Sequence, residues 1–136
     1  MRRAVLLLDG QRCAYCRSPM AIGIPMVVEH IIPLIAGGSS TLENLCLSCY
    51  RCNEFKGSRQ TGQYADEPTP IALFHPRRQH WCDHFGWDTS GLVIQARTPH
   101  GEVTIATLHL NNAWIVQARR LWIIAGIHPP LGETTP

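Results

Sequence analysis

Two cysteine pairs constrain this chain more than any other feature of its sequence. Two residues separate the members of each pair, Cys13 with Cys16 and Cys49 with Cys52. One such pair presents two thiolates to the same ion, and two pairs complete the four sulfur ligands of a tetrahedral zinc site that has no position left for water. We therefore expect a structural zinc ion on these four cysteines, with the intervening segment enclosed as folded chain.

Disulfide bonds are the alternative use of these cysteines. The apolar run that follows Arg2 and Arg3 ends at Leu8, so it is shorter than the core of a secretion signal. Without such a signal, paired spacing favours zinc over disulfides, and we expect a soluble cytoplasmic protein. We expect the remaining Cys46 and Cys82 to be buried as small apolar side chains, although Cys46 could compete for the metal.

Length and charge limit the remaining possibilities. With 136 residues, the chain supports one modest core, so we expect a single compact domain. The formal net charge of +2 does not indicate a nucleic-acid partner by itself, because phosphate binding depends on clustered Lys and Arg. No apolar run approaches the roughly 20 residues needed to cross a bilayer, and we expect no membrane partner.

The first part of the chain predicts short elements that precede a conspicuous dipeptide. Residues 1–12 should form a short helix or strand. Ile22–Ile32 is rich in Ile and Val and should form one bent strand or two short ones, which Pro33 ends. The dipeptide Glu29-His30 lies at the end of this strand.

Two helices are predicted after the strand. Ser40, with Glu43 three residues later, has the spacing of a capping box for a short helix through Leu45. A second helix should run through residues 52–56. Gly57 can end that helix, because glycine readily adopts the backbone conformation of a C-terminal cap.

The second half predicts a linker, a hairpin and a helix. Residues 60–70 mix polar residues with prolines and show no periodicity, as in a surface linker. Two β-prone runs, Leu92–Arg97 and Glu102–Leu108, flank turn residues and predict a β-hairpin. A final helix should begin at Asn111–Asn112. Its apolar residues recur at helical spacing and should pack on the hairpin: Ile115, Ala118, Leu121, Trp122 and Ala125.

An ordered set of short motifs lies inside and just beyond the cysteine pairs. The motifs are Glu29-His30-Ile31-Ile32-Pro33, Gly37-Gly38, Asn44-Leu45 and Cys52-Asn53-x-x-Lys56. From Cys13 to about Gly57, this set together with the cysteines resembles the HNH endonuclease family. The resemblance implies a ββα-metal finger, in which a strand pair presents a base and the following helix presents a ligand to one divalent ion.

The resemblance also implies a role for each motif residue. His30 matches the general base, and an imidazole that titrates near neutrality suits proton removal from water. Glu29, where the family more often has Asp, and Asn53 match the metal ligands, whose oxygens suit Mg²⁺ or Mn²⁺. Asn44 matches the residue that fixes the loop and orients the base. Adjacent residues of a regular strand point to opposite faces, so a strand end or bulge must re-aim Glu29 or His30.

Basic and aromatic residues beyond the motifs allow several interpretations. Basic side chains near the site could neutralise phosphates or could be scattered solvated charges. Histidines and aromatic residues in the C-terminal half could form a second metal site, a base-stacking surface, or a mixture of core and surface. This half resembles an extension of a bacterial subset of such proteins, to which we assign no catalytic role. The basic residues are Arg51, Lys56, Arg59, Arg77 and Arg78, and the second group is His75, His80, His84, Trp81, Phe85 and Trp87.

These inferences give one expected protein and two alternatives. We expect an α+β fold with a zinc-bound ββα-metal core (residues 1–59), a surface linker (60–70) and a hairpin–helix extension (71–136) packed on the core. The expected activity is metal-dependent hydrolysis of DNA by nicking or double-strand cleavage, with RNA left open, using structural Zn²⁺ and catalytic Mg²⁺ or Mn²⁺. The alternatives are a catalytically silent zinc module that binds nucleic acid or a protein, and a structural zinc domain that binds a partner through exposed tryptophans.

Overall fold

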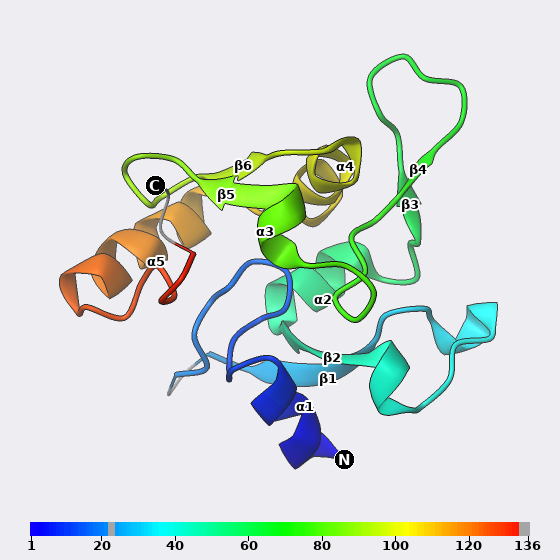
Figure 1. Ribbon diagram of the computed structural model, residues 1–136, viewed down its shortest axis with the longest axis horizontal. Helices are drawn as coiled ribbons and strands as arrows, with labels where there is room; N and C mark the ends of the chain where they lie inside the picture. The colour runs from blue at the N-terminus through cyan, green and yellow to red at the C-terminus, as the bar shows by residue number, and fades with distance from the viewer. Residues whose placement is uncertain (22–23, 134–136) are drawn as a thin grey trace.

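The computed structural model describes residues 1–21 and 24–133 and has a mixed α+β architecture of short elements (Figure 1). The predicted α+β class is confirmed. None of the helices within these ranges is long and apolar enough to cross a membrane. In chain order the elements are α1 (Arg2–Leu8), β1 (Met26–His30), β2 (Leu45–Cys49), α2 (Tyr50–Lys56), β3 (Thr61–Gly62), β4 (Ile71–Ala72), α3 (Trp81–His84), β5 (Phe85–Trp87), β6 (Ile94–Ala96), α4 (Pro99–Leu108) and α5 (Ala113–Ile124).

A regular antiparallel hairpin of β1 and β2 is the centre of the first half. Its residues pair one to one, from Met26 opposite Cys49 to His30 opposite Leu45. In the view of Figure 1 the hairpin lies between α1 and α2, and α2 contacts both strands. The strand predicted within residues 22–32 is thus a single strand, while residues 22–23 of that prediction lie outside the described residues.

The capping box predicted at Ser40 is wrong, whereas the second helix is confirmed. The chain forms only a 3₁₀ turn at Leu42–Asn44, which Thr41 precedes without a side-chain cap, and residue 45 already begins β2. Pairing with β1 buries every residue of β2, and this burial outweighs the local helix signal. Helix α2 ends at Lys56 as predicted, where the N–H of Gly57 donates to the carbonyl of Asn53 at 3.0 Å.

The region between α2 and α3 has more structure than its composition indicates. Thr61 pairs with Ala72 and Gly62 with Ile71, so that β3 and β4 join the two ends of the expected linker. The residues between these strands form the long loop beside the β3 and β4 labels in Figure 1. The pairing fixes where the chain re-enters the fold, next to α4, which contacts both strands.

The predicted hairpin of residues 92–97 with residues 102–108 is wrong, although its first run does contain a strand. Strand β6 pairs with β5, whereas residues 102–108 belong to helix α4. Thr98 begins this helix, because its Oγ1 accepts from the N–H of Gly101 at 3.1 Å and Pro99 occupies the first helical turn. The Thr-Pro sequence is therefore a helix start rather than a turn.

Helix α5 is confirmed, and its predicted apolar face is only partly buried. The helix begins after Asn112, whose side chain accepts from the N–H of Ile115 at 3.0 Å. Ile115, Ala118 and Trp122 of that face are half-buried, whereas Leu121 and Ala125 are exposed, and Arg119 is the buried residue of the helix. Hydrophobic spacing therefore identified the helix and part of its inner side, but not the buried arginine.

Arg119 attaches α5 through polar contacts. Its guanidinium donates to the carbonyl of Leu92 at 2.8 Å and to that of Leu110 at 2.6 Å. The Cζ of the same guanidinium lies 5.0 Å from the ring centre of Trp87, in a cation–π contact. A fixed cation thus occupies the position where the periodicity predicts apolar side chains.

Contacts between distant segments join the two halves of the chain. The Asp9 carboxylate accepts two bonds from Arg77, at 2.7 and 2.9 Å, and one from the N–H of Leu47 at 2.7 Å. The indole N–H of Trp81 donates to the carbonyl of Tyr15 at 2.9 Å. Residues of the C-terminal half therefore help to fix both α1 and the first cysteine segment.

We predict that Thr98→Ala lowers the free energy of unfolding by about 1 kcal/mol, the usual cost of losing an N-terminal cap. Thr98→Ser keeps the hydroxyl and should remain close to the parent protein. Chemical denaturation measures both variants. Equal stability of the alanine and serine variants would show that the cap on α4 contributes nothing.

Candidate active site and metal centre

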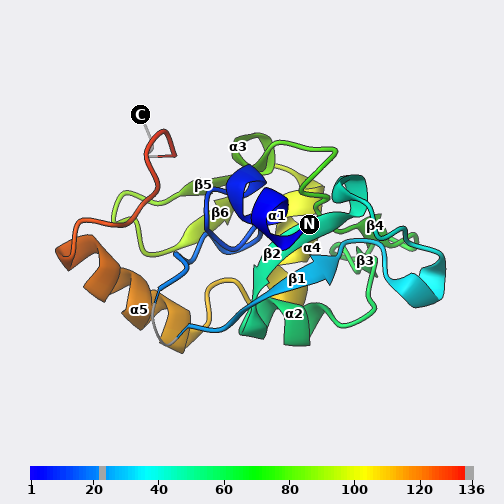
Figure 2. The same cartoon turned by 90° about the horizontal axis from the view of Figure 1, so that it is seen from below.

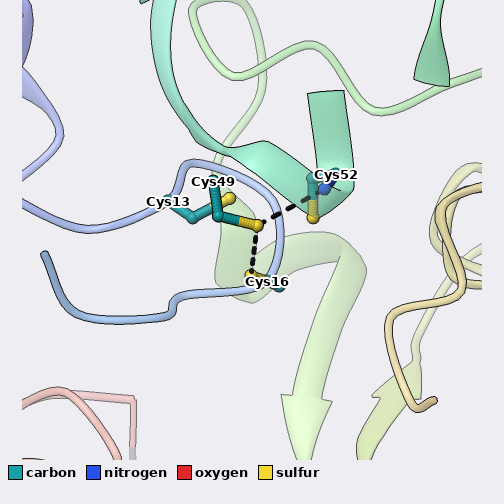
Figure 3. A group of neighbouring side chains, drawn as sticks. All are labelled: Cys13, Cys16, Cys49 and Cys52. Atoms are coloured by element: carbon teal, nitrogen blue, oxygen red, sulfur yellow. Dashed lines mark hydrogen bonds between the residues drawn. The ribbon is translucent and has the colours of Figure 1, made fainter. Parts of the chain in front are cut away.

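The four paired cysteines form one buried cluster (Figure 3). Their sulfur atoms all lie within 4.8 Å of one another, and the Sγ atoms of Cys16 and Cys49 are 3.7 Å apart. Four converging sulfur atoms shielded from water suit a tetrahedral zinc ion in a structural role. The cysteines are free thiols, so the disulfide alternative is not realised.

Local structure brings these sulfur atoms together. The first pair lies on a tight loop, whose Ala14 N–H donates to the Leu47 carbonyl of β2 at 2.8 Å. The second pair spans the start of α2, where the Cys49 sulfur accepts from the N–H of Cys52 at 3.4 Å. Hydrogen bonds among the four thiols, those with Cys13 above all, hold the pKa of Cys16 well below its usual range and raise the pKa values of Cys49 and Cys52. Without an ion, the cluster therefore favours one thiolate beside neutral thiols.

The two remaining cysteines, Cys46 and Cys82, differ in their burial. Cys46 is buried as predicted, and its thiol donates to the hydroxyl of Tyr15 at 3.8 Å. It is not part of the four-cysteine group and does not compete for the metal there. The prediction that Cys82 is buried is wrong, because this residue lies on the exposed side of the short helix α3.

His30 is at the end of β1, where the chain leaves the hairpin. Its side chain is half-buried, and its Nε2 forms a hydrogen bond of 2.9 Å with Oγ of Ser40. Ser40 is a site residue that sequence reasoning missed, because its spacing to Glu43 indicated a helix cap instead. The bond fixes the orientation of the imidazole, while the ring stays accessible to solvent.

Asn44 closes the loop that connects His30 with Ser40. Its Oδ1 accepts from the N–H of Ile32 at 2.8 Å, and its Nδ2 donates to the carbonyls of Ile32 and Ser39 at 2.9 and 2.8 Å. Gly38 lies against the same contacts, since an added Cβ would be 1.8 Å from the carbonyl oxygen of Ile32. The buried amide therefore determines the shape of the loop that carries the partner of His30.

Glu29 faces the other side of the hairpin from His30. The one-to-one pairing of β1 and β2 contains no bulge that would re-aim either side chain. Glu29 is 6% exposed, and the ammonium of Lys56 lies 3.0 Å from its Oε1. The same ammonium donates to the carbonyl of Ile31 at 2.8 Å, so Lys56 ties α2 to the end of β1.

The carboxyl group of Glu29 is poised between its two protonation states. Burial raises the pKa of Glu29 from 4.5 to about 7, and the opposing effect of Lys56 limits the rise. Its Oε1 is a buried oxygen without a well-aligned hydrogen bond, although Lys56 is close. This group could therefore act as an oxygen ligand when it is charged.

The chemistry of Glu29 and Asn53 fits a hard divalent ion. Asn53 is half-buried and lies one helical turn before Lys56, so both side chains are on the same side of α2. The amide of Asn53 forms no hydrogen bond within the described part of the chain, which leaves its oxygen as a donor. An ion at Glu29 would have to compete with the ammonium of Lys56.

The five basic residues near the site differ in their availability. Arg51, Arg59 and Arg78 are exposed, although Arg51 also donates to Oδ1 of Asn112 at 2.7 Å. Lys56 is buried against Glu29, and the fork of Arg77 is held by Asp9. Three side chains therefore remain at the surface, where phosphates could reach them, and two instead hold the fold together.

The histidine and aromatic group of the C-terminal half is a mixture of core and surface. Trp81, Phe85 and Trp87 are buried, whereas His80 is exposed. Among residues 1–21 and 24–133, the cysteine cluster is the one group of three or more side chains of the metal-ligating types His, Cys, Asp and Glu. A second metal site on these histidines is therefore not found.

Comparisons with known proteins agree with the motifs. Residues 13–59 match the family described as HNH endonuclease. A stretch of 80 residues is 34% identical to the CRISPR-associated endonuclease Cas9 of Corynebacterium diphtheriae, and it covers 55% of this chain and 7% of that protein. The chain thus spans a small part of the length of this relative. No solved structure matches the chain. The resemblance to the HNH endonuclease family is confirmed for residues 13–59, which supports a nuclease type of function.

We predict that Cys52→Ser abolishes stoichiometric zinc binding and lowers stability by several kcal/mol, because a structural zinc site contributes about 10 kcal/mol of apparent binding free energy in small domains. Elemental analysis and chemical denaturation measure the two effects. Cys82→Ser is the matched control and should retain zinc and stability. Zinc retained by the Cys52 variant would contradict a four-sulfur site.

We predict that Lys56→Met destabilises the protein by about 3–5 kcal/mol at about pH 8, because it leaves the charge of Glu29 buried without a partner. The cost should shrink near pH 5, where the carboxyl group is protonated.

The sign follows from the raised pKa of Glu29. The stabilising effect of its neutral form is complete below 4.5 and is lost as the pH rises through about 7. Denaturation across this pH range measures the dependence, with Glu29→Gln as the control that should flatten it. A Lys56→Met cost that does not change with pH would exclude coupling to Glu29.

Proposed function

We propose, from the match of residues 13–59 to the HNH endonuclease family, that this chain is a metal-dependent endonuclease that hydrolyses DNA phosphodiester bonds with His30 as the general base. The observation that carries the proposal is the hydrogen bond of 2.9 Å between His30 and Ser40, inside the matched segment. RNA is left open as a second substrate. The free thiols favour action in the reducing cytoplasm.

The imidazole of His30 is held in a way that suits proton transfer. A neutral imidazole has one nitrogen that donates and one that accepts. When Nε2–H donates to Ser40, the Nδ1 lone pair is free to take a proton from water. Asn44 keeps Ser40 within reach by fixing the loop, so it is a positioning residue that acts through the orientation of the base.

By the resemblance, Glu29 and Asn53 would hold the divalent ion, Mg²⁺ or Mn²⁺. Because Glu29 faces away from His30 in this structure, a shared site would require one of the two side chains to turn toward the other. When bound, such an ion supplies Lewis-acid stabilisation of charge on the phosphate and the leaving oxygen. The buried carboxylate of Glu29 and the amide oxygen of Asn53 are the kinds of ligand that such an ion prefers. Lys56 supplies a positive charge to the same carboxylate in the absence of the ion, which keeps the buried carboxylate compensated.

The surface arginines would hold the nucleic acid. Arg51 lies in α2, Arg59 lies just after it, and Arg78 lies in the segment after β4. All three are exposed, and each could neutralise a phosphate. Contacts of this kind position a strand without reading its sequence. We propose that residues 1–59 form the catalytic core and that residues 71–136 pack on it, joined by residues 60–70.

A catalytically silent zinc module that binds nucleic acid or a protein is the second candidate. The Glu29–Lys56 ion pair favours this candidate, because the Lys56 ammonium already occupies the position beside the carboxylate that a metal ion would need. In that case the zinc cluster and the basic surface would remain functional without cleavage.

We predict that the zinc-loaded protein nicks plasmid DNA with Mg²⁺ or Mn²⁺, and that His30→Ala slows nicking by about 10²–10⁴-fold, the usual contribution of a general base. His80→Ala is the matched control, because His80 is exposed and outside the matched segment. Ser40→Ala should lower the rate less than His30→Ala does. DNA binding without metal-dependent nicking would establish the silent module instead.

A further inference from the structure

A cavity of about 290 Å³ lies where the matched segment meets the rest of the chain. The backbone that follows His30, at Ile31 and Ile32, forms one wall together with Lys56. The opposite wall comes from the segment after β4, up to Gln79. The cavity therefore lies beside the strand end that carries the proposed base, and both halves of the chain form it.

The polar residues that line this cavity carry more hydrogen-bond donors than acceptors. They are Lys56, Gln60, His75, Arg78 and Gln79, and no Asp or Glu is among them in the described part of the chain. The Oε1 of Gln79 already accepts from the N–H of His75 at 2.8 Å, so its amide N–H₂ remains to donate. Lys56 is offset by Glu29, which leaves Arg78 as the uncompensated positive charge.

His75 adds a buried donor without a partner. Its Nδ1 accepts from the N–H of Arg77 at 3.2 Å, so the proton of the neutral ring is on Nε2. That Nε2 is buried and has no hydrogen-bond partner among residues 1–21 and 24–133. Burial, with a further effect of Arg78, lowers the pKa of His75, which keeps the ring neutral and the proton on Nε2. A buried donor without a partner is costly unless a ligand satisfies it.

The segment that carries these donors is held rigidly. The N–H groups of Arg78 and Gln79 donate to the carbonyl of His75 at 3.1 and 3.0 Å, forming a tight turn. Phe74, which precedes His75, is buried, and its N–H donates to Oγ1 of Thr104 in α4 at 2.9 Å. The backbone that carries His75 and Arg78 is therefore fixed before any ligand arrives, which reduces part of the entropy cost of binding.

The geometry points to a phosphate-binding subsite in this cavity, in which Arg78, Gln60 and His75 hold a backbone phosphodiester of the nucleic acid next to the bond that is cut. A lining that is rich in donors and has no carboxylate suits an anion, and Arg78 is exposed to solvent. The identification of the anion as a nucleic-acid phosphate rests on the proposed function. The subsite assigns a substrate-binding role to the extension after residue 59.

Binding of a fluorescein-labelled DNA duplex to the zinc-loaded protein, without added Mg²⁺ or Mn²⁺, tests the subsite. Arg78→Gln should weaken binding about tenfold, since a hydrogen bond to a charged group contributes about 1.5–3 kcal/mol. It should also reduce the slope of log affinity against log salt by about 1. Gln60→Ala should weaken binding and leave that slope unchanged, because Gln60 is neutral.

Arg120→Gln is the matched control, since Arg120 is an exposed arginine of α5 outside this cavity. Equal effects of the Arg78 and Arg120 variants, or no effect of the Arg78 variant, would overturn the subsite. Zinc content and thermal unfolding of each variant verify the fold. Plasmid nicking with Mg²⁺ separates the two proposals. If Arg78→Gln weakens DNA binding but no protein, the parent included, nicks the plasmid, the nuclease proposal is removed and the subsite is kept. If the parent protein nicks the plasmid but Arg78→Gln binds DNA as the parent does, only the subsite is removed.

Discussion

The convergence of four thiols is the constraint on which the rest of the structure depends. It joins a tight loop near the N-terminus to the point where β2 becomes α2, and this junction fixes the helix against the hairpin. A chain of this size has elements too short to be stable alone, so a zinc ion on these four cysteines would compensate for limited apolar burial. Figure 2 shows the result, with α5 at one end of the molecule and the loop after β1 at the other.

The hairpin of β1 and β2 separates two chemical environments. His30 meets solvent and a hydroxyl on one face, while Glu29 meets an ammonium and a thiol in the interior. The ammonium also binds the carbonyl after the base, so the interior pair and the base share one strand end. A change in the charge of the interior carboxyl group therefore acts on the backbone that supports the imidazole.

Residue patterns predicted the parts of the site whose roles are local. Paired cysteines, the dipeptide Glu29-His30 and the glycine after α2 each act through spacing or backbone conformation, which the sequence displays directly. The role of Lys56 could not be predicted, because it depends on a carboxylate distant in the chain that folding brings to 3.0 Å. Helix α4 was missed since Thr98 and Pro99 fit both a turn and a helix start. Arg119 was missed because hydrophobic periodicity gives no weight to a buried cation.

The two adjacent glycines of the loop show how neighbouring positions can tolerate different replacements. Gly37 has a φ of +87° and open space around a would-be Cβ, so only its backbone conformation resists a side chain. Gly38 meets the carbonyl of Ile32 and the amide of Asn44, where no side chain has room. In a library of variants of this loop, asparagine or aspartate would survive at the first glycine, and the second would admit no substitution without opening the loop.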